Sequence, residues 1–195
     1  MPGLPDDDLY RRLRSGDELA FTELYGRWQG PLYRFALRMS GQPTLAEDVV
    51  HEVFMTLIRG QAGYEPARGP LGAYLYGVAR HQLHRKLARE RTYVPLPDDE
   101  AGELAELDGS PDPLAEQTQR ERVDRVRAAV RTLPLPYRET LVLCDLQALS
   151  YDEAARALEC SPGAIRPRLH RARRLLLSKL QAERAAPARA AGGRR

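Results

Sequence analysis

The sequence predicts an all-α fold of two small helical domains joined by a flexible acidic linker, with a helix-turn-helix in the second domain. Three observations support this fold class. Apolar residues recur at steps of three or four in both halves of the 195-residue chain, as on the buried face of a helix. Residues 97–119 hold eight acidic side chains and no basic one, together with glycine and proline. Arginines crowd one face of a helical pattern near the C-terminus.

The first long helix is expected from about Asp17 to Ser40. Its apolar face consists of Phe21, Leu24, Tyr25, Trp28, Leu32, Phe35 and Met39. Gly30 and Pro31 are expected to bend this helix, and Gly41 is expected to end it.

A second helix follows and runs through Arg59. Thr44 and Glu47 predict a capping box, in which each side chain accepts a hydrogen bond from the other residue's backbone N–H. The core face of this helix consists of Val49, Val50, Val53, Phe54, Leu57 and Ile58.

After a loop over residues 60–69, Pro70 opens a third helix that extends to about Arg91. Tyrosines stand near its start and cations crowd its second half: Tyr64, Tyr74, Tyr76, Arg80, His81, His84, Arg85, Lys86, Arg89 and Arg91. Cations hold phosphates and aromatic rings stack on unpaired bases, so this mixture suits separated DNA strands. The alternative is that the tyrosines belong to the core or its rim.

Composition sets the domain boundaries. We expect an N-terminal domain over residues 1–92, the acidic linker over 93–113, a C-terminal domain over 114–182 and a disordered basic tail over 183–195. The acidic start lacks the pattern of a signal peptide, and no apolar run is long enough to span a membrane. A soluble, cytoplasmic protein without direct membrane insertion is therefore expected.

Metal and catalytic sites are not expected. Cys144 and Cys160 lie far apart without a metal-binding spacing, and Cys144 lies in an apolar helical run that would bury it. His81 and His84 are three residues apart, but no carboxylate or cysteine nearby completes a metal site. The sequence shows no nucleophile motif and no glycine-rich phosphate loop, so we expect neither cofactor nor enzyme activity.

The helix-turn-helix is predicted over residues 149–180. Ser150 and Glu153 form a capping box that starts its first helix, whose small apolar face holds Ala154, Ala155 and Leu158. Ser161 as N-cap and Pro162 at the first helical position start the second helix.

The second helix of this motif carries the arginines. Its inward residues are Ile165, Leu169, Ala172, Leu176 and Leu180, and its largely outward residues are Arg166, Arg168, His170, Arg171, Arg173 and Arg174. Arginine binds guanine with two donors in the major groove and also neutralises phosphates. A solvated basic helix is the alternative, but the preceding capped helix and short turn favour DNA binding.

Four stretches in this order resemble the bacterial RNA polymerase sigma factors of the extracytoplasmic-function (ECF) type. They are AFTELYGRWQGPLYRFALRMSG, AEDVVHEVFMTLIR, GPLGAYLYGVARHQLHRKLARER and LPLPYRETLVLCDLQALSYDEAARALECSPGAIRPRLHRARRLL. They cover residues 17–180 apart from the linker. The resemblance implies two helical domains that bridge core RNA polymerase and promoter DNA, both duplex and melted.

The resemblance also implies three sets of site residues. Asp48, His51, Glu52 and Met55 would contact the clamp coiled coil of the largest polymerase subunit. Tyr74, Arg80, His81, His84, Arg85 and Lys86 would bind the minus-ten element and capture an extruded base. Ser161, Arg166, Arg168, His170, Arg171, Arg173 and Arg174 would bind the minus-thirty-five element, the last two through phosphates.

Several positions depart from the family pattern. His51 stands where glutamine is common, His81 where asparagine is common and Arg85 where aspartate is frequent. Glu159 replaces a turn glycine, and a left-handed backbone there would cost roughly 1 kcal/mol. Pro167 replaces a serine and removes a backbone donor, so the recognition helix would bend or begin late.

The resemblance further implies regulation by a dedicated anti-sigma factor, often membrane-anchored. It also implies that the acidic linker threads a positively charged polymerase channel, although a plain solvated tether fits the same composition. Two other function classes remain open: a stand-alone DNA-binding regulator that binds a two-fold-symmetric site, and a small helical enzyme, which the missing catalytic residues disfavour.

Overall fold

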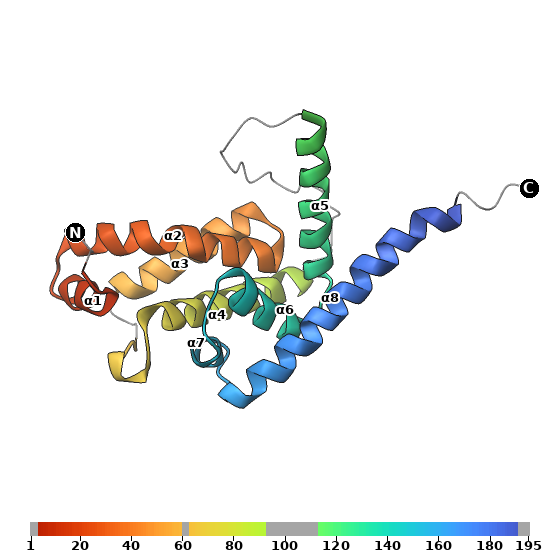
Figure 1. Ribbon diagram of the computed structural model, residues 1–195. Coiled ribbons are helices and arrows are strands. Elements are labelled where there is room, and N and C mark those ends of the chain that lie inside the picture. Colours follow the sequence, from red (N-terminus) through yellow and green to blue (C-terminus); the bar gives the residue numbers. More distant parts are fainter. Residues whose placement is uncertain (1–3, 60–62, 93–112, 191–195) are drawn as a thin grey trace, which may run out of the picture.

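The computed structural model describes residues 4–59, 63–92 and 113–190, and every regular element in these ranges is helical (Figure 1). The helices are α1 (Asp6–Arg14), α2 (Glu18–Ser40), α3 (Pro43–Ile58), α4 (Leu71–Thr92), α5 (Pro113–Arg131), α6 (Leu135–Leu141), α7 (Tyr151–Ala157) and α8 (Pro162–Ala190). A 3-10 turn, Pro66–Arg68, precedes α4, and a π-helical turn, Val142–Leu146, follows α6. The predicted all-α fold class is confirmed.

The N-terminal helices pack around α2. The carboxylate of Asp17 caps this helix by accepting hydrogen bonds from the backbone N–H groups of Leu19 and Ala20, at 2.9 and 3.2 Å. Gly41 ends it in the left-handed conformation, with φ at 79°, as the sequence predicts. The buried face of α2 includes Leu24, Leu32, Phe35, Ala36 and Met39, and α3 and α4 lie against this helix.

The start of α3 differs from the prediction. Pro43 occupies the first helical position, and Gln42, with an extended backbone, is the N-cap. No side chain caps this helix, so the capping box predicted from Thr44 and Glu47 is wrong. The reason is that proline has a helical φ and no N–H to satisfy, so the helix starts at Pro43. Thr44 therefore lies inside the first turn and not at the cap position.

The first helix, α1, is absent from the sequence prediction. Its apolar residues Leu9 and Tyr10 are buried. Asp6 accepts hydrogen bonds from the Arg27 guanidinium and from the indole N–H of Trp28, at 2.8 and 2.9 Å. A helix of nine residues is too short to be stable alone, so these contacts with α2 hold it in place.

The C-terminal helices pack around the first half of α8. The predicted capping box of α7 is confirmed: Glu153 N–H donates to Ser150 Oγ at 3.3 Å, and Ser150 N–H donates to Glu153 Oε2 at 2.8 Å. Helix α8 runs without a break through Pro167, so the recognition helix does not begin late.

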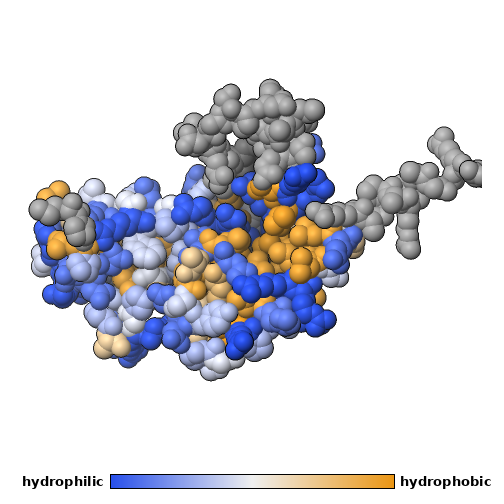
Figure 2. All heavy atoms as spheres, viewed as in Figure 1, coloured by the Kyte–Doolittle hydropathy of each residue, from blue (hydrophilic) through white to orange (hydrophobic). Residues whose placement is uncertain are grey.

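Helix α8 also corrects the predicted tail. It continues to Ala190, so residues 183–190, predicted to be disordered, belong to this helix. Residues 191–195 lie outside the described residues, as does the predicted linker up to residue 112. The outer part of α8 and most of α5 project from the body of the molecule (Figure 1), and Figure 2 shows an apolar area where these two helices meet.

The two helical groups lie against each other. Helix α4 lies along α7, and α2 contacts α5 and the π-helical turn. Buried residues from both groups form one continuous cluster. Gly77 of α4 faces the backbone of Ala157, where a Cβ atom would lie 3.6 Å from the carbonyl oxygen. That distance is an ordinary van der Waals contact, so α4 and α7 lie side by side at Gly77 with room for a methyl group.

Candidate nucleic-acid interface

The arginine face of α8 is arranged as the sequence predicts. Ile165, Leu169 and Ala172 are buried against the other C-terminal helices. The residues Ser161, Arg166, His170, Arg171, Arg173 and Arg174 are exposed, and Arg168 is half-buried. Six of the seven predicted residues are therefore exposed around the side of α8 that the buried stripe leaves free, and Arg168 lies at the border of that stripe. Such a face fits the dimensions and charge of a DNA major groove.

One of these arginines has an internal partner. Arg173 donates from Nε and Nη2 to the two carboxylate oxygens of Asp145, at 2.9 and 2.6 Å. This fork of hydrogen bonds raises the pKa of Arg173, mainly through the direct bond to Asp145. The pair fastens α8 to the π-helical turn, so Arg173 also has a structural role that the sequence did not predict.

A cavity of about 550 Å³ lies beside α4, and its lining includes Tyr74 and His81, both predicted for the minus-ten element. The ring of Tyr74 lies 5.5 Å from that of Tyr64, measured between centroids. Burial raises the pKa of Tyr74 above its ordinary value. Arg156 and Glu159, from the C-terminal helices, also line this cavity.

Two other predicted residues of α4 point at the C-terminal helices instead of at solvent. Arg80 Nε donates to Glu139 Oε1 at 2.8 Å, and His84 Nε2 lies 2.6 Å from the same oxygen. The side chain of Glu139 is only 5% exposed. Arg80 also lies 3.7 Å from a carboxylate oxygen of Glu159. The sequence did not single out Glu139, because an acidic residue in a short helix carries no signal of a distant partner.

The structure links two residues that were predicted for different sites. Lys86 Nζ of α4 donates to Asp48 Oδ2 of α3 at 2.7 Å. Arg85 is exposed and donates to the side-chain oxygen of Gln82. The six minus-ten candidates thus divide into a pair at the cavity, a pair facing Glu139 and a pair on the outer surface.

The predicted polymerase-binding face lies on α3. His51 is exposed and Met55 half-buried, and both line a groove of about 620 Å³ between α2 and α3. Asp48 is exposed and Glu52 half-buried on the same helix. The groove also contains Tyr25, Tyr33 and Ile58, which were not predicted as site residues. Ile58 is 50% exposed although it ends an apolar stripe, and Tyr25 is exposed although it was predicted to face the core.

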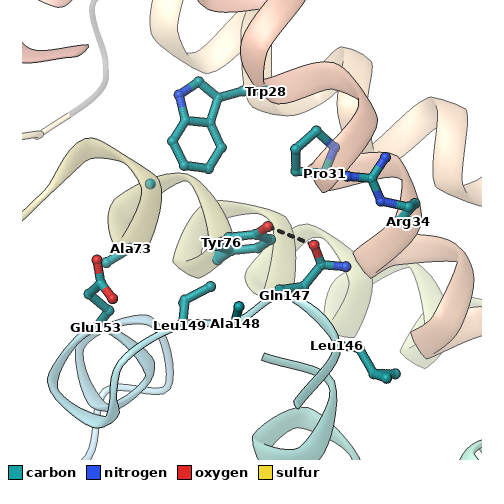
Figure 3. Close-up of a pocket in the computed structure, with 11 residues that line it drawn as sticks. Trp28, Pro31, Arg34, Ala73, Tyr76, Leu146, Gln147, Ala148, Leu149 and Glu153 are labelled. Atoms are coloured by element: carbon teal, nitrogen blue, oxygen red, sulfur yellow. Dashed lines mark hydrogen bonds between the residues drawn. The ribbon is translucent and has the colours of Figure 1, made fainter. Parts of the chain in front are cut away.

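A further cavity, of about 430 Å³, lies between the two helical groups (Figure 3). Tyr76 of α4 donates its hydroxyl hydrogen to Gln147 Oε1 at 3.0 Å across this cavity. Burial raises the pKa of Tyr76 to about 12, which keeps the donor protonated. Trp28, Pro31 and Arg34 of α2 close the opposite side. Tyr76 therefore helps to join the two groups.

Membrane-spanning helices and metal-binding clusters are both absent from the residues that the structure describes. No helix among them combines the length and apolar character needed to cross a membrane. Within the same residues, no group of three or more histidine, cysteine, aspartate or glutamate side chains is placed to bind a metal ion. Cys144 and Cys160 are free thiols.

Two protein-family models match the chain. Sigma-70 region 2 matches residues 24–93, which include α3, α4 and most of α2. Sigma-70, region 4, matches residues 124–176, which include α6, α7 and the first half of α8. The two matches fall on the two helical groups in the order that the sequence predicts.

The curated relatives agree with these models. The chain is 32% identical to the ECF RNA polymerase sigma factor SigE of Mycolicibacterium smegmatis over 83% of its own length and 63% of that protein's. It is 30% identical to the RNA polymerase sigma factor CarQ of Myxococcus xanthus, with coverage of 88% and 97%. It is 31% identical to the ECF RNA polymerase sigma factor EcfG of Rhodopseudomonas palustris, over 77% of each chain. The chain thus spans under two thirds of SigE but nearly all of CarQ.

Two solved structures share the fold. CnrH in complex with the cytosolic domain of CnrY superposes with a TM-score of 0.68 at 25% identity, covering 91% of this chain and 97% of that one. The sigma factor RpoE from Bartonella quintana, in complex with the anti-sigma factor NepR, gives a TM-score of 0.65 at 25% identity. That match covers 83% of this chain and 96% of RpoE.

Proposed function

Because the chain belongs to the ECF sigma factors of bacterial RNA polymerase, we propose that it binds core RNA polymerase and directs promoter-specific transcription initiation. The observation that carries this proposal is the pairing of a region 2 and a region 4 match on two helical groups, the second of which presents an arginine face. Catalysis of RNA synthesis belongs to the polymerase, and this chain supplies promoter recognition. No cofactor is needed for that role.

The arginine face of α8 would read the minus-thirty-five element. Arg166, Arg168, His170 and Arg171 would reach base edges in the major groove, where arginine discriminates guanine with two donors. Arg174 would bind phosphate. Arg173 would also bind phosphate, either while it keeps its hydrogen bonds to Asp145 or after those bonds break. Ser161 stands beside the start of α8, whose free N–H groups favour a phosphate.

Helix α4 would receive the minus-ten element. The cavity beside Tyr74 and His81 offers an aromatic wall and a polar edge to an unpaired base. Arg80, His84, Arg85 and Lys86 would hold the adjacent backbone by charge. Stacking and phosphate contacts together would offset the few kcal/mol that unstacking a base costs.

The exposed face of α3 would bind the clamp coiled coil of core polymerase. Asp48, His51, Glu52 and Met55 lie along it, and the neighbouring aromatic groove adds apolar surface that a partner helix buries. An interface with polar groups around an apolar centre suits a helical partner.

Regulation by an anti-sigma factor is part of the proposal. RpoE is found with an anti-sigma factor and CnrH with the cytosolic domain of CnrY, and both have the fold of this chain. Such a partner would cover the α3 face or the arginine face, and a membrane-anchored one would hold the protein at the membrane. The protein itself would act in the cytoplasm.

Transcription in vitro tests the proposal. Bacterial core polymerase is incubated with a library of genomic fragments, with and without the protein, and transcript starts are mapped. Discrete starts that depend on the protein are expected. Absence of both transcription and core binding would contradict the proposal, and specific binding to a two-fold-symmetric duplex without polymerase would identify a stand-alone regulator instead.

A further inference from the structure

The cavity between the two helical groups, here named the Tyr76 cavity, has the features of a binding site for a small molecule. Its volume is about 430 Å³, and residues of α2, α4, α7 and the segment after the π-helical turn line it. Cavities that bind small ligands usually measure about 300–1,000 Å³ and combine apolar walls with a few placed polar groups. The residues that line the Tyr76 cavity therefore decide which class of molecule fits it.

Aromatic and aliphatic side chains form two walls of this cavity. Trp28 and Pro31 of α2 lie on one side, and Tyr76 of α4 and Leu149 lie on the other (Figure 3). The rings of Trp28 and Tyr76 meet edge to face, with centroids 6.1 Å apart and planes at 84°. The indole N–H of Trp28 donates to Asp6 at 2.9 Å, which holds this ring in position. Such walls favour a planar apolar group.

One polar atom of the cavity has no partner. The Nε2 atom of Gln147 is buried and, among the residues that the structure describes, makes no hydrogen bond. The oxygen of the same amide accepts the hydroxyl hydrogen of Tyr76 at 3.0 Å, which orients the amide. Figure 3 shows the amide nitrogen turned away from Tyr76 and towards Arg34. A buried donor without an acceptor is destabilising, so a ligand oxygen that accepts from Nε2 would bind favourably.

The cavity also has a cation at its edge. Arg34 of α2 is exposed, and no carboxylate within the described ranges forms an ion pair with it. Its guanidinium lies back along α2, because a Cβ atom on Gly30 would be 3.2 Å from Nη1. The charge of Arg34 also acts on Tyr76, whose pKa burial raises to about 12 and Arg34 lowers in part. Arg34 therefore stands near the hydrogen-bonded pair of Tyr76 and Gln147.

A carboxylate of the protein lies at the other end of the cavity. Figure 3 shows Glu153 of α7 on the side opposite Arg34. Glu153 Oε2 accepts hydrogen bonds from the backbone N–H and the hydroxyl of Ser150, at 2.8 and 2.6 Å. Glu153 is thus engaged in the cap of α7. The Arg34 end of the cavity has a positive charge that no described carboxylate balances.

We propose that the Tyr76 cavity binds a small carboxylate that carries one aromatic ring. The carboxylate accepts hydrogen bonds from the Arg34 guanidinium and from Gln147 Nε2, and the ring packs against Trp28 and Tyr76. A planar guanidinium pairs with a carboxylate through two parallel hydrogen bonds, which a neutral polar group does not offer. One cation with one amide donor suits a single negative charge.

This inference goes beyond the proposed function and does not depend on it. The residues that would hold the ligand are not among those proposed to bind promoter DNA or core polymerase. Binding is measured on the protein alone, so the result leaves the proposed sigma function untouched in either direction.

The fluorescence of Trp28 tests the proposal. Trp28 is the only tryptophan of the chain, so excitation at the red edge of the absorption, where tyrosine does not absorb, reports on this cavity. The full chain is titrated at constant ionic strength with phenylacetate and with phenylacetamide, which has a similar shape and no charge. Phenylacetate is expected to change the emission to saturation and to bind at least about tenfold more tightly than phenylacetamide. Absence of saturation with phenylacetate, or equal affinities for the two compounds, would overturn the proposal.

Two variants test the position of the carboxylate. Arg34→Gln removes the guanidinium and Gln147→Leu removes the amide donor, and circular dichroism checks that both fold. The matched control, Arg59→Gln, removes an exposed arginine that does not line the cavity. Compared with this control, Arg34→Gln is expected to bind phenylacetate at least about tenfold more weakly and Gln147→Leu about fivefold more weakly. An affinity of Arg34→Gln equal to that of the control would contradict the proposed contact.

Nuclear magnetic resonance gives a readout that is independent of fluorescence. The side-chain NH₂ signals of Gln147 are assigned by their loss in Gln147→Leu. They are expected to move on addition of phenylacetate and to stay in place with phenylacetamide, because only the carboxylate is a charged acceptor. Unmoved Gln147 signals at saturation would place the compound elsewhere on the protein and refute the site. Inorganic phosphate tests the need for the ring: binding as tight as that of phenylacetate would overturn the assigned ligand class.

Discussion

Replacing Glu159 by glycine is expected to stabilise the protein, although it removes an ionic contact. The left-handed backbone at this residue, with φ at 52°, costs a non-glycine residue roughly 1–2 kcal/mol. Glycine removes that cost, but about 0.4–1 kcal/mol of the gain is lost again, because glycine makes the unfolded chain more flexible. The contact with Arg80 is 3.7 Å long and the Glu159 side chain is 84% exposed, so the loss of this ionic contact costs only about 0.3 kcal/mol.

The central values leave a net gain in the free energy of unfolding of about 0.5 kcal/mol, which raises the midpoint of thermal unfolding by about 1–2 °C in a chain of this size. Differential scanning calorimetry of wild-type and Glu159→Gly protein measures it. Ala148 provides a matched control, because it has the same left-handed backbone, with φ at 57°, and no charge. Ala148→Gly is expected to raise the midpoint similarly. A lower midpoint for both variants would refute the strain argument, and a lower midpoint for Glu159→Gly alone would refute the small value given to the ionic contact.

Four other changes have defined outcomes. Ser150→Ala removes the cap of α7 and should lower the free energy of unfolding by about 1 kcal/mol in urea titrations, with unchanged stability as the contrary result. Gly72→Ala places a Cβ against the ring of Trp28, closer than two carbon atoms can pack, and should cost about 1–3 kcal/mol in the same assay. A neutral effect would contradict the close packing. Arg171→Ala should weaken binding of the holoenzyme to a minus-thirty-five duplex and relax selectivity at one base pair, and a uniform loss across all sequences would indicate a phosphate contact instead. Burial raises the pKa of Cys144 from 9.0 to about 11. The folded state therefore holds the thiol proton more tightly than the unfolded chain, and the stability that this contributes is full below pH 9 and is lost as the pH rises towards 11. Rapid alkylation of Cys144 at pH 8 in native protein would contradict this.

Local signals predicted the long helices well. The stop at Gly41, the box at Ser150 and the start at Pro162 depend on residues that are neighbours in sequence, so the pattern alone predicts them. The box at Thr44 failed because Pro43, one residue earlier, competes for the start of α3 and favours an earlier first turn.

Elements that depend on distant contacts were not predicted. Helix α1 is held by hydrogen bonds from Asp6 to Arg27 and Trp28, which no local pattern reveals. The end of the chain was expected to lack structure because it has little to bury, yet α8 reaches Ala190. Alanine and arginine are strong helix formers, so a helix that already exists extends through such a segment without burial.

The same division holds for the candidate site: features that depend on neighbours in sequence were predicted, and features that depend on distant contacts were not. The periodicity of α8 placed its arginines on one exposed face, and the structure agrees. The partners of Arg80 and His84 were not predictable, because Glu139 lies in another helical group and the pairing arises only when the two groups pack. Site residues that act through one helix face are thus readable from sequence, and those that act across an interface are not.

The most direct test of the sigma assignment changes the distance between the two promoter elements. A promoter found by transcript mapping is given a spacer longer by half a helical turn, about 5 bp, which rotates one element to the opposite side of the duplex. Because one chain bound to polymerase is proposed to hold both elements, transcription in vitro should fall to background, and a full-turn insertion should not restore it. Undiminished transcription from the half-turn promoter would contradict the account, since it would mean that the two helical groups do not read the promoter as one unit.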